Sequence, residues 1–241
     1  MMKPEIIHLK CAIIKSGTSE PMSRSKAMPI QPFIAVFSSL PDNDSLDIET
    51  LRLKSITLLA LCAMLRPSDI APRSVQYVPG EDCAVNRQLL TSDICFHENF
   101  MKITFHGIKN DTQRRGFVVT IHCATDRKLC PVICLKHYIN RTASQRESAN
   151  GAVFLTLQRP YRGISAPTVS NILSKSIRMA GLKGYLPKDF RPTGATAAVD
   201  AGFGEQSIMK VGRWKDAAVF REHYVHSKIP DNFTDKILLT Q

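Results

Sequence analysis

Hydrophobic residues recur at helical spacing over most of the chain. The densest run lies between residues 48 and 65, where apolar side chains are so frequent that the predicted helix must be buried on most sides. Residues 166–180 form a second clear helix, with Ser165 as its N-cap and Gly181 as its terminator. The pattern predicts further helices over residues 32–40, 67–71, 131–140, 192–202, 205–211 and 216–225.

Between residues 93 and 123 the hydrophobic period changes from helical spacing to alternation. Apolar and polar residues alternate in short runs, which is typical of strands with one buried face. We therefore expect a small three-stranded antiparallel sheet, and Val153–Leu155 is a candidate for a further short strand. The fold class predicted for the whole chain is α+β, mostly α-helical. The alternating residues are Ile94 and Phe96, then Met101, Ile103 and Phe105, then Phe117, Val119 and Ile121.

Composition and charge narrow the class of protein. A chain of 241 residues with 44% hydrophobic residues is long enough for one full core. Its 32 Lys and Arg against 21 Asp and Glu give a net charge of +11, which favours a polyanionic partner or a membrane surface, although a merely basic soluble protein has the same balance. No run of 18 or more apolar residues occurs, and the first residues lack the apolar core of a secretory signal. We therefore expect an intracellular protein with no membrane partner, located in the nucleus if its source is eukaryotic.

The cysteines and acidic residues give no pattern typical of a cofactor site. Seven cysteines, an odd number without a regular framework, favour reduced thiols. The group Cys123, Cys130, Cys134 and His137 contains zinc-ligand residue types, but its spacing is not that of a zinc finger, so we interpret these as core cysteines. The sequence contains no Walker loop, dinucleotide fingerprint, paired carboxylates or HExxH motif. We expect neither a metal nor another cofactor.

Six residues in a fixed order are the candidates for catalysis. Cleavage of a phosphodiester without a metal needs cations for the phosphate, a nucleophile, and an acid for the leaving oxygen. The planar donor groups of an arginine match phosphate oxygens, and an indole N–H can donate to these oxygens without repelling them. A lysine can act as the acid, and nearby cations would favour the phenolate form of a tyrosine. Alone, each residue has an ordinary structural interpretation, such as a loop lysine or a core tryptophan. The residues are Arg66, Lys109, Lys188, Arg191, Trp214 and Tyr224.

In order and near spacing, these residues resemble the catalytic domain of tyrosine recombinases, the family that contains phage integrases and Cre. The resemblance is carried by Leu58–Asp69, the hairpin around Lys109, Ile164–Val169 and Lys188–Tyr224. It implies that Arg66 and Arg191 clamp the scissile phosphate, that Lys109 protonates the 5′ oxygen, and that Trp214 fills a position held by His or Trp. Tyr224 would then attack phosphorus to form a 3′-phosphotyrosyl link. Asp69 matches an acidic position that buttresses the first arginine.

The resemblance also implies partners and a domain organisation. The expected partner is double-stranded DNA, with self-association on it as a dimer or tetramer and with no small-molecule substrate. Further DNA contacts are expected from Arg114, Arg115 and Arg213. Residues 1–31 would be a linker or the remnant of an N-terminal DNA-binding domain, residues 32–228 the catalytic domain, and residues 229–241 a tail that can exchange between protomers. A eukaryotic mobile element is the expected source.

Three departures from the family pattern leave alternatives open. Lys188 stands where the family usually has histidine, the interval from Trp214 to Tyr224 is one residue longer, and an insertion falls near residues 78–91. The roughly 30 residues before Pro32 are too few for the family's N-terminal helical domain. The alternatives are a DNA-binding module of transposon origin that no longer cuts, and a type IB topoisomerase that relaxes DNA.

Overall fold

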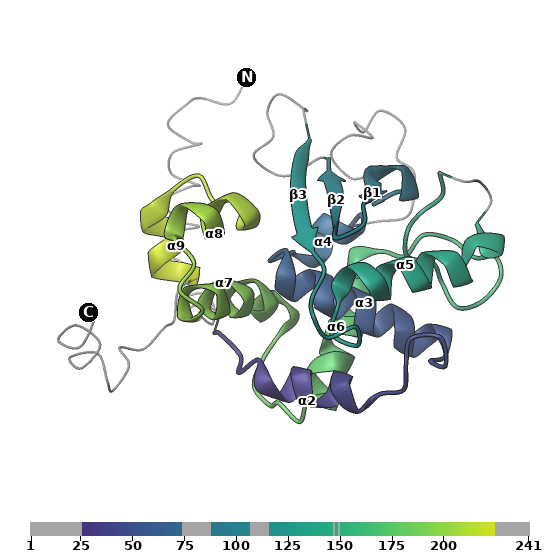
Figure 1. The fold of residues 1–241 in the computed structure, drawn as a ribbon, viewed down its shortest axis with the longest axis horizontal. Coiled ribbons are helices and arrows are strands. Elements are labelled where there is room, and N and C mark those ends of the chain that lie inside the picture. Colours follow the sequence, from purple (N-terminus) through teal and green to yellow (C-terminus); the bar gives the residue numbers. More distant parts are fainter. Residues whose placement is uncertain (1–25, 74–87, 107–115, 147, 149, 225–241) are drawn as a thin grey trace, which may run out of the picture.

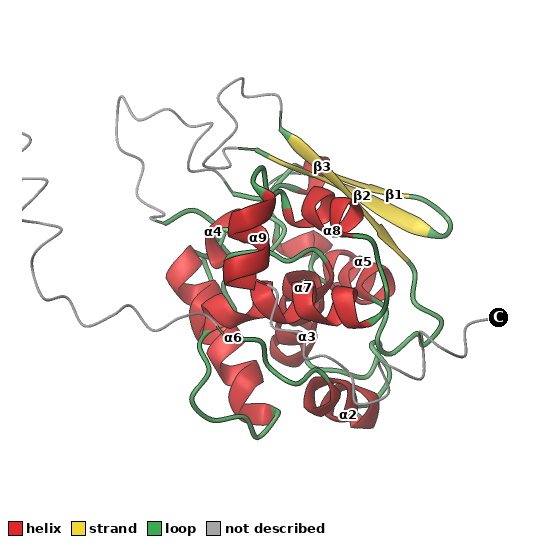
Figure 2. Cartoon of the chain, turned by 90° about the vertical axis from the view of Figure 1, so that its left-hand side faces the viewer, coloured by secondary structure: helices red, strands yellow, loops and turns green. Residues whose placement is uncertain are grey.

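The computed structural model describes residues 26–73, 88–106, 116–146, 148 and 150–224. Helices make up most of this part of the chain, and a small sheet lies over one side of them (Figures 1 and 2). The predicted α+β class is therefore confirmed. The helices are α2 (Gln31–Ser39), α3 (Ile48–Cys62), α4 (Pro67–Ile70), α5 (Pro131–Arg141), α6 (Ala166–Met179), α7 (Phe190–Asp200), α8 (Glu205–Gly212) and α9 (Ala217–Tyr224), with short 3-10 turns η1 (Thr91–Asp93), η2 (Ala143–Gln145) and η3 (Pro187–Asp189).

The sheet has the three antiparallel strands that the alternation predicts. They are β1 (Ile94–Phe96), β2 (Phe100–Phe105) and β3 (Phe117–His122), in the order β1-β2-β3. Met101 pairs with Ile121 and Ile103 with Val119, so the apolar residues of neighbouring strands share one buried face. Residues 153–155 are not a strand as expected: Leu155 makes one isolated bridge, to Gly163.

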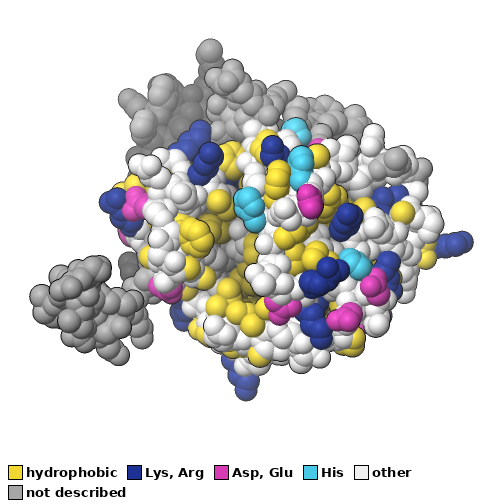
Figure 3. All heavy atoms as spheres, in the orientation of Figure 1, with side chains coloured by type: hydrophobic (Ala, Val, Ile, Leu, Met, Phe, Trp, Pro, Cys, Tyr) yellow, Lys and Arg dark blue, Asp and Glu magenta, His cyan; other side chains and the backbone are white. Residues whose placement is uncertain are grey.

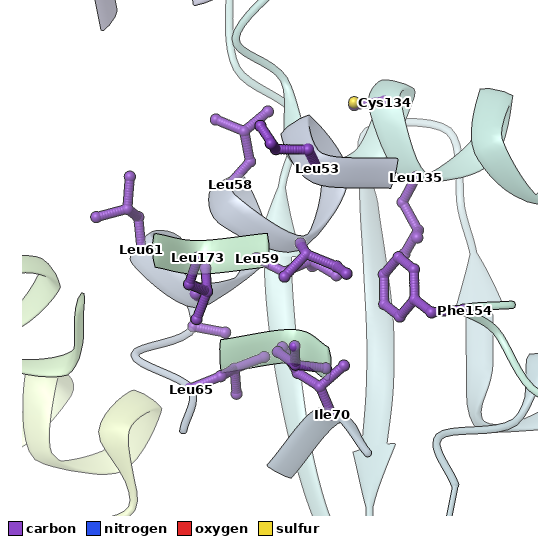
Figure 4. Close-up of a cluster of buried hydrophobic side chains, with 14 of the residues drawn as sticks. Leu53, Leu58, Leu59, Leu61, Leu65, Ile70, Cys134, Leu135, Phe154 and Leu173 are labelled. Atoms are coloured by element: carbon purple, nitrogen blue, oxygen red, sulfur yellow. The ribbon is translucent and has the colours of Figure 1, made fainter. Parts of the chain in front are cut away.

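Helix α3 is the centre of the core. It packs against α5, α6 and α7, and every residue from Leu51 to Leu61 is buried, as the dense apolar run predicts. Figure 4 shows leucine side chains leaving this helix in several directions, with Leu173 of α6 and Phe154 close to them. Polar residues buried in α3 find partners: the Lys54 ammonium donates to Asn43 Oδ1 (2.9 Å).

Helix α3 ends earlier than predicted, at Cys62 instead of near residue 65. Met64 has a positive φ of 51°, and the Leu65 amide donates to the Ala60 carbonyl (3.1 Å), which is the closure that terminates a helix at a left-handed residue. Glycine normally marks such an end, and here a methionine takes the position. Arg66 comes two residues after Met64, as the N-cap of α4.

The remaining helices follow the sequence closely. Ser165 caps α6 by accepting from the Thr168 amide, and Gly181 ends that helix with a φ of 68°. Helix α7 begins at Phe190, so Arg191 lies inside its first turn and not just before it. Met28, within the segment assigned to a linker, is buried, and its amide donates to Thr193 Oγ1 (2.8 Å). In the described part of the chain, none of the helices has both the length and the apolar character needed to span a bilayer.

Helix α7 crosses α3 at a point where only glycine fits. A Cβ built on Gly194 would overlap the Leu61 carbonyl oxygen and press on the Met64 side chain. Gly194 is buried and lies one turn after Arg191, so this close approach sets the distance between the first turn of α7 and the end of α3.

Replacing Gly194 with Ala should lower the free energy of unfolding by about 2–3 kcal/mol, because α7 must move away from α3. In an open helix the same change would stabilise by about 1 kcal/mol, so the sign of the effect is diagnostic. Urea unfolding followed by circular dichroism measures it. Gly204→Ala is the control, since a Cβ there meets no atom within 4 Å, and its cost should stay at or below about 1 kcal/mol. Equal effects at both positions would contradict the packing argument.

Candidate active site

A cavity of about 900 Å³ opens between α4, α6, η3, α7 and α9. Four of the six predicted catalytic residues line it: Arg66 at the start of α4, Lys188 in η3, Arg191 in α7 and Tyr224 at the end of α9. None of the described residues that line the cavity is acidic. On the face shown in Figure 3, by contrast, basic, acidic and apolar side chains are intermixed. The cavity therefore combines positive charge with a phenol.

Arg191 is held by the ends of two helices. Its Nη1 donates to the Met64 carbonyl just beyond α3 (2.7 Å), and its Nη2 donates to the carbonyl of Gly212, the last residue of α8. Carbonyls at helix C-terminal ends lack partners in their own helix and carry partial negative charge, so they suit a cation. Each terminal nitrogen keeps one further N–H, and the side chain lines the cavity.

The charge environment of Arg191 is unusual for an arginine. Burial lowers the pKa of this guanidinium, the positive charges of Arg66 and Arg213 lower it further, and Asp69 and Tyr224 act in the opposite direction. Its pKa, lowered to about 9, still lies above neutral pH, so Arg191 stays charged there. A buried cation near two others attracts an anion strongly.

Tyr224 faces two of these arginines. The Arg191 Cζ lies 5.3 Å from the centre of its ring, and the Thr196 hydroxyl donates to its backbone carbonyl (3.4 Å). Burial acts to raise the pKa of the Tyr224 phenol. Arg66 and Arg191 each lower it, through their positive charge and through a hydrogen bond to the phenol, and the pKa ends below its usual value. The phenolate therefore forms more easily at this position than in a tyrosine without such neighbours.

Trp214 lies behind the cavity and not on its wall. Its ring centre is 4.8 Å from those of Phe220 and Tyr224, and the Arg191 Cζ lies 4.1 Å from it. The indole Nε1 is buried and has no hydrogen-bond partner among the described residues. Donation of this N–H to a phosphate oxygen stays a prediction; in this structure the indole supports Arg191 and Tyr224 by packing.

A glycine allows this packing. A Cβ on Gly212 would overlap the six-membered ring of Trp214. The Trp214 amide closes the end of α8 by donating to the Met209 carbonyl (3.0 Å), which turns the indole back over the helix end. The Gly-Arg-Trp triplet of the sequence is thus a helix terminus that folds its tryptophan onto the preceding glycine.

Arg213, for which a DNA contact is predicted, is turned inward in this structure. Its side chain is only 4% exposed, and its Nη2 donates to Asp69 Oδ2 at 2.6 Å. The expected support of the first arginine by Asp69 takes a specific form: the carboxylate accepts a hydrogen bond from the Arg66 backbone amide (2.8 Å). Asp69 thus fixes the backbone of Arg66 and pairs with Arg213.

Lys188 is exposed at the cavity, and its neighbour Asp189 holds the turn that carries it. The Asp189 carboxylate is buried and accepts from the amides of Leu186 (2.8 Å) and Lys26 (3.1 Å). Lys109, Arg114 and Arg115 lie outside the described residues, so their predicted roles stay predictions.

Three lining residues were missed by sequence reasoning: Arg73, Ser170 and Asn171. The two polar residues of α6 carry a weak signal, because they lie in the N-terminal half of a predicted helix. Arg73 has no motif around it. All three reach the cavity because α4 packs against α6, and that packing is not visible in the local sequence.

The cysteine interpretation can also be checked. Cys130 and Cys134 are fully buried in the main hydrophobic cluster, which confirms these two as core residues, whereas Cys123 is only partly buried at the edge of that cluster. Within the described ranges, no group of three or more His, Cys, Asp or Glu side chains is arranged to hold a metal ion.

Comparison with known proteins identifies the fold. No family model matches the sequence, and no curated protein matches it. The structure of XerA recombinase is similar with a TM-score of 0.61 and 17% identity, over 91% of this chain and 66% of that one. The structure of XerH site-specific recombinase bound to a palindromic difH substrate gives 0.61 and 11%, over 93% and 57%. The Tn1549 transposon integrase in complex with transposon right end DNA gives 0.54 and 11%, over 95% and 70%.

This chain spans only 66% and 57% of the length of the two Xer recombinase chains. At these identities the likeness concerns the fold, and it covers more than nine-tenths of the present chain in each case. The match agrees with the resemblance noted in the sequence. The chain therefore has the tyrosine recombinase fold.

Proposed function

We propose that this chain is a site-specific DNA recombinase or integrase that cuts and rejoins DNA strands through a covalent 3′-phosphotyrosine intermediate. The observation that carries the proposal is the meeting of Arg66, Lys188, Arg191 and Tyr224 at one cavity without an acidic residue in its described wall. The fold supports it, because XerH and the Tn1549 integrase with the same fold are described in complex with DNA.

The first step is capture of a backbone phosphate. Arg66 at the cavity surface and the N–H groups of Arg191 that do not bond to the Met64 and Gly212 carbonyls donate to the non-bridging oxygens. Arg191 is already oriented by the carbonyls of Met64 and Gly212, so little reorganisation accompanies binding. Lys188 adds a third positive charge to the wall. The net charge of +11 supports a polyanionic substrate of this kind.

The second step is attack on phosphorus. The Tyr224 phenol loses its proton to solvent, helped by its lowered pKa, and its oxygen forms a bond to phosphorus. The bond from phosphorus to the 5′ oxygen breaks, and that oxygen takes a proton from a lysine ammonium. Lys109 is the proposed donor from the family resemblance. The phosphodiester energy is kept in the phosphotyrosyl bond, and the reverse step joins a 5′ hydroxyl without ATP.

The proposal extends to partners. Double-stranded DNA is the substrate, and strand exchange requires at least two copies of the chain on it. Arg114 and Arg115 are proposed to contact the DNA backbone near the Lys109 hairpin.

Tyr224→Phe should abolish covalent attachment to DNA, because it removes the oxygen that bonds to phosphorus and leaves the ring packing on Trp214 in place. The substrate is a labelled duplex pool with a randomised centre and a nick in one strand, so that the fragment freed by cleavage diffuses away. The label should stay with the protein in denaturing gels and be released by protease.

The matched control is Tyr161→Phe, which removes a phenol outside the cavity lining and should leave the adduct yield unchanged. Adduct formation by the Tyr224→Phe protein would exclude Tyr224 as the nucleophile. No adduct from the unaltered chain with any pool would overturn the proposed function.

The rate of adduct formation should rise with pH and level off above the pKa of Tyr224, because only the phenolate attacks. The usual pKa of tyrosine is about 10. The midpoint should lie below it, since Arg66 and Arg191 lower the pKa of Tyr224 despite burial. Arg66→Gln should move the midpoint to higher pH, in addition to slowing the reaction.

Single-turnover rates between about pH 6 and 10.5 give the midpoint, because this range extends past the usual tyrosine pKa of about 10. Arg178→Gln removes an equal charge from the exposed last turn of α6, outside the cavity, and should leave the midpoint in place. An Arg66→Gln midpoint equal to that of the unaltered chain would show that Arg66 does not activate the phenol.

A further inference from the structure

The ion pair between Arg213 and Asp69 joins two parts of the chain that are 144 residues apart. Asp69 belongs to α4, the helix that follows Arg66. Arg213 is the C-cap that follows α8, and Trp214 and α9, whose last residue is Tyr224, come after it. The pair therefore connects the element that presents Arg66 with the helix pair that presents Tyr224.

One carboxylate oxygen makes both connections. Asp69 Oδ2 accepts from the backbone amide of Arg66 (2.8 Å) and from Arg213 Nη2 (2.6 Å). A shift of Arg213 relative to Asp69 would thus be felt at the backbone of Arg66. The side chains of Arg213 and Asp69 are only 4% and 7% exposed, so screening by solvent is weak.

Arg213 depends strongly on this one partner. Its Nε and Nη1 are buried and have no hydrogen-bond partner among the described residues, and its Cζ lies 5.2 Å from the Phe105 ring and 6.0 Å from the Phe117 ring. These rings are the β2 and β3 residues that pair at the end of the sheet. Its left-handed backbone, with φ of 63°, turns the side chain inward from the end of α8.

We infer that Arg213 is a positioning residue, which through Asp69 fixes the α8–α9 pair against α4 so that Tyr224 and Arg66 face the same phosphate. The inference rests on the proposed function for the roles of Tyr224 and Arg66. Arg213 itself does not line the cavity and touches no reacting atom.

The test uses two variants that change the local charge in opposite directions. Arg213→Met removes a positive charge, and Asp69→Asn removes a negative charge while keeping the shape of the side chain. If only direct electrostatics mattered, the first change would raise the pKa of Tyr224 and the second would lower it. If the pair positions Arg66 against Tyr224, both changes separate the two groups, and both should raise the pKa of Tyr224 by about 1 pH unit.

The measurement is a pH titration of phenolate absorbance on the full chain without DNA. Subtracting the same variant with an added Tyr224→Phe substitution isolates this one tyrosine. Because no cleavage is needed, a chain that never cuts DNA still gives an answer, so failure of the inference and failure of the proposed function are separate results.

Arg221→Met is the matched control. Arg221 lies on α9 and pairs with Glu205 of α8 through two bonds of 2.7 and 2.9 Å at an exposed site. This variant loses the same charge from the same helix pair but keeps the connection to α4, so the Tyr224 pKa should not change.

A second readout applies if the chain forms the DNA adduct. Both variants should slow adduct formation by about 10²-fold, the cost of a misplacement near 1 Å, with the DNA dissociation constant unchanged. A lower or unchanged Tyr224 pKa in folded Asp69→Asn would overturn the inference. Loss of folding in both variants, seen by circular dichroism, would also overturn it, because the pair would then hold the whole domain together and not the site in particular.

Discussion

The site depends on how the guanidinium of Arg191 is buried. A cation that is 3% exposed is stable only if polar partners replace its water shell, and here the partners are the carbonyls of Met64 and Gly212. The face of Trp214 covers the same guanidinium, with its centre 4.1 Å from Arg191 Cζ. Loss of either carbonyl would leave a buried charge short of a hydrogen bond, which costs more than the bond itself contributes.

This arrangement explains two backbone features that otherwise look unrelated. Met64 and Arg213 are the two non-glycine residues with positive φ in the described part of the chain. Each follows a helix that ends beside Arg191, and each left-handed turn exposes helix-end carbonyls to the guanidinium. The same turns also set the positions of nearby residues. Arg66 follows two residues after Met64 and lines the cavity, and Trp214 follows Arg213 and packs over Gly212. The geometry around one side chain thus sets the position of the others.

The sequence predicted what local periodicity controls. The helices, the three strands and the caps of α6 agree with the pattern, because each depends on residues a few positions apart. It missed the end of α3, because a methionine in the left-handed region has no sequence signature comparable to glycine. The inward orientation of Arg213 was also missed, because its partner Asp69 is 144 residues away. The packing of the Trp214 indole against Tyr224 could not be predicted either, because it depends on how α8 ends.

The charges of the site are unbalanced before any substrate binds. The positive charges of Arg66 and Arg213 repel that of Arg191 and lower its pKa. Asp69 acts in the opposite direction on the same pKa. The Asp69 carboxylate is paired with Arg213, whose Nη2 lies 2.6 Å from it. Arg66 and Arg191 therefore line the cavity together with the Tyr224 phenol, whose pKa they lower. An anion that entered the cavity would relieve this repulsion, and the same two charges favour the phenolate form of Tyr224.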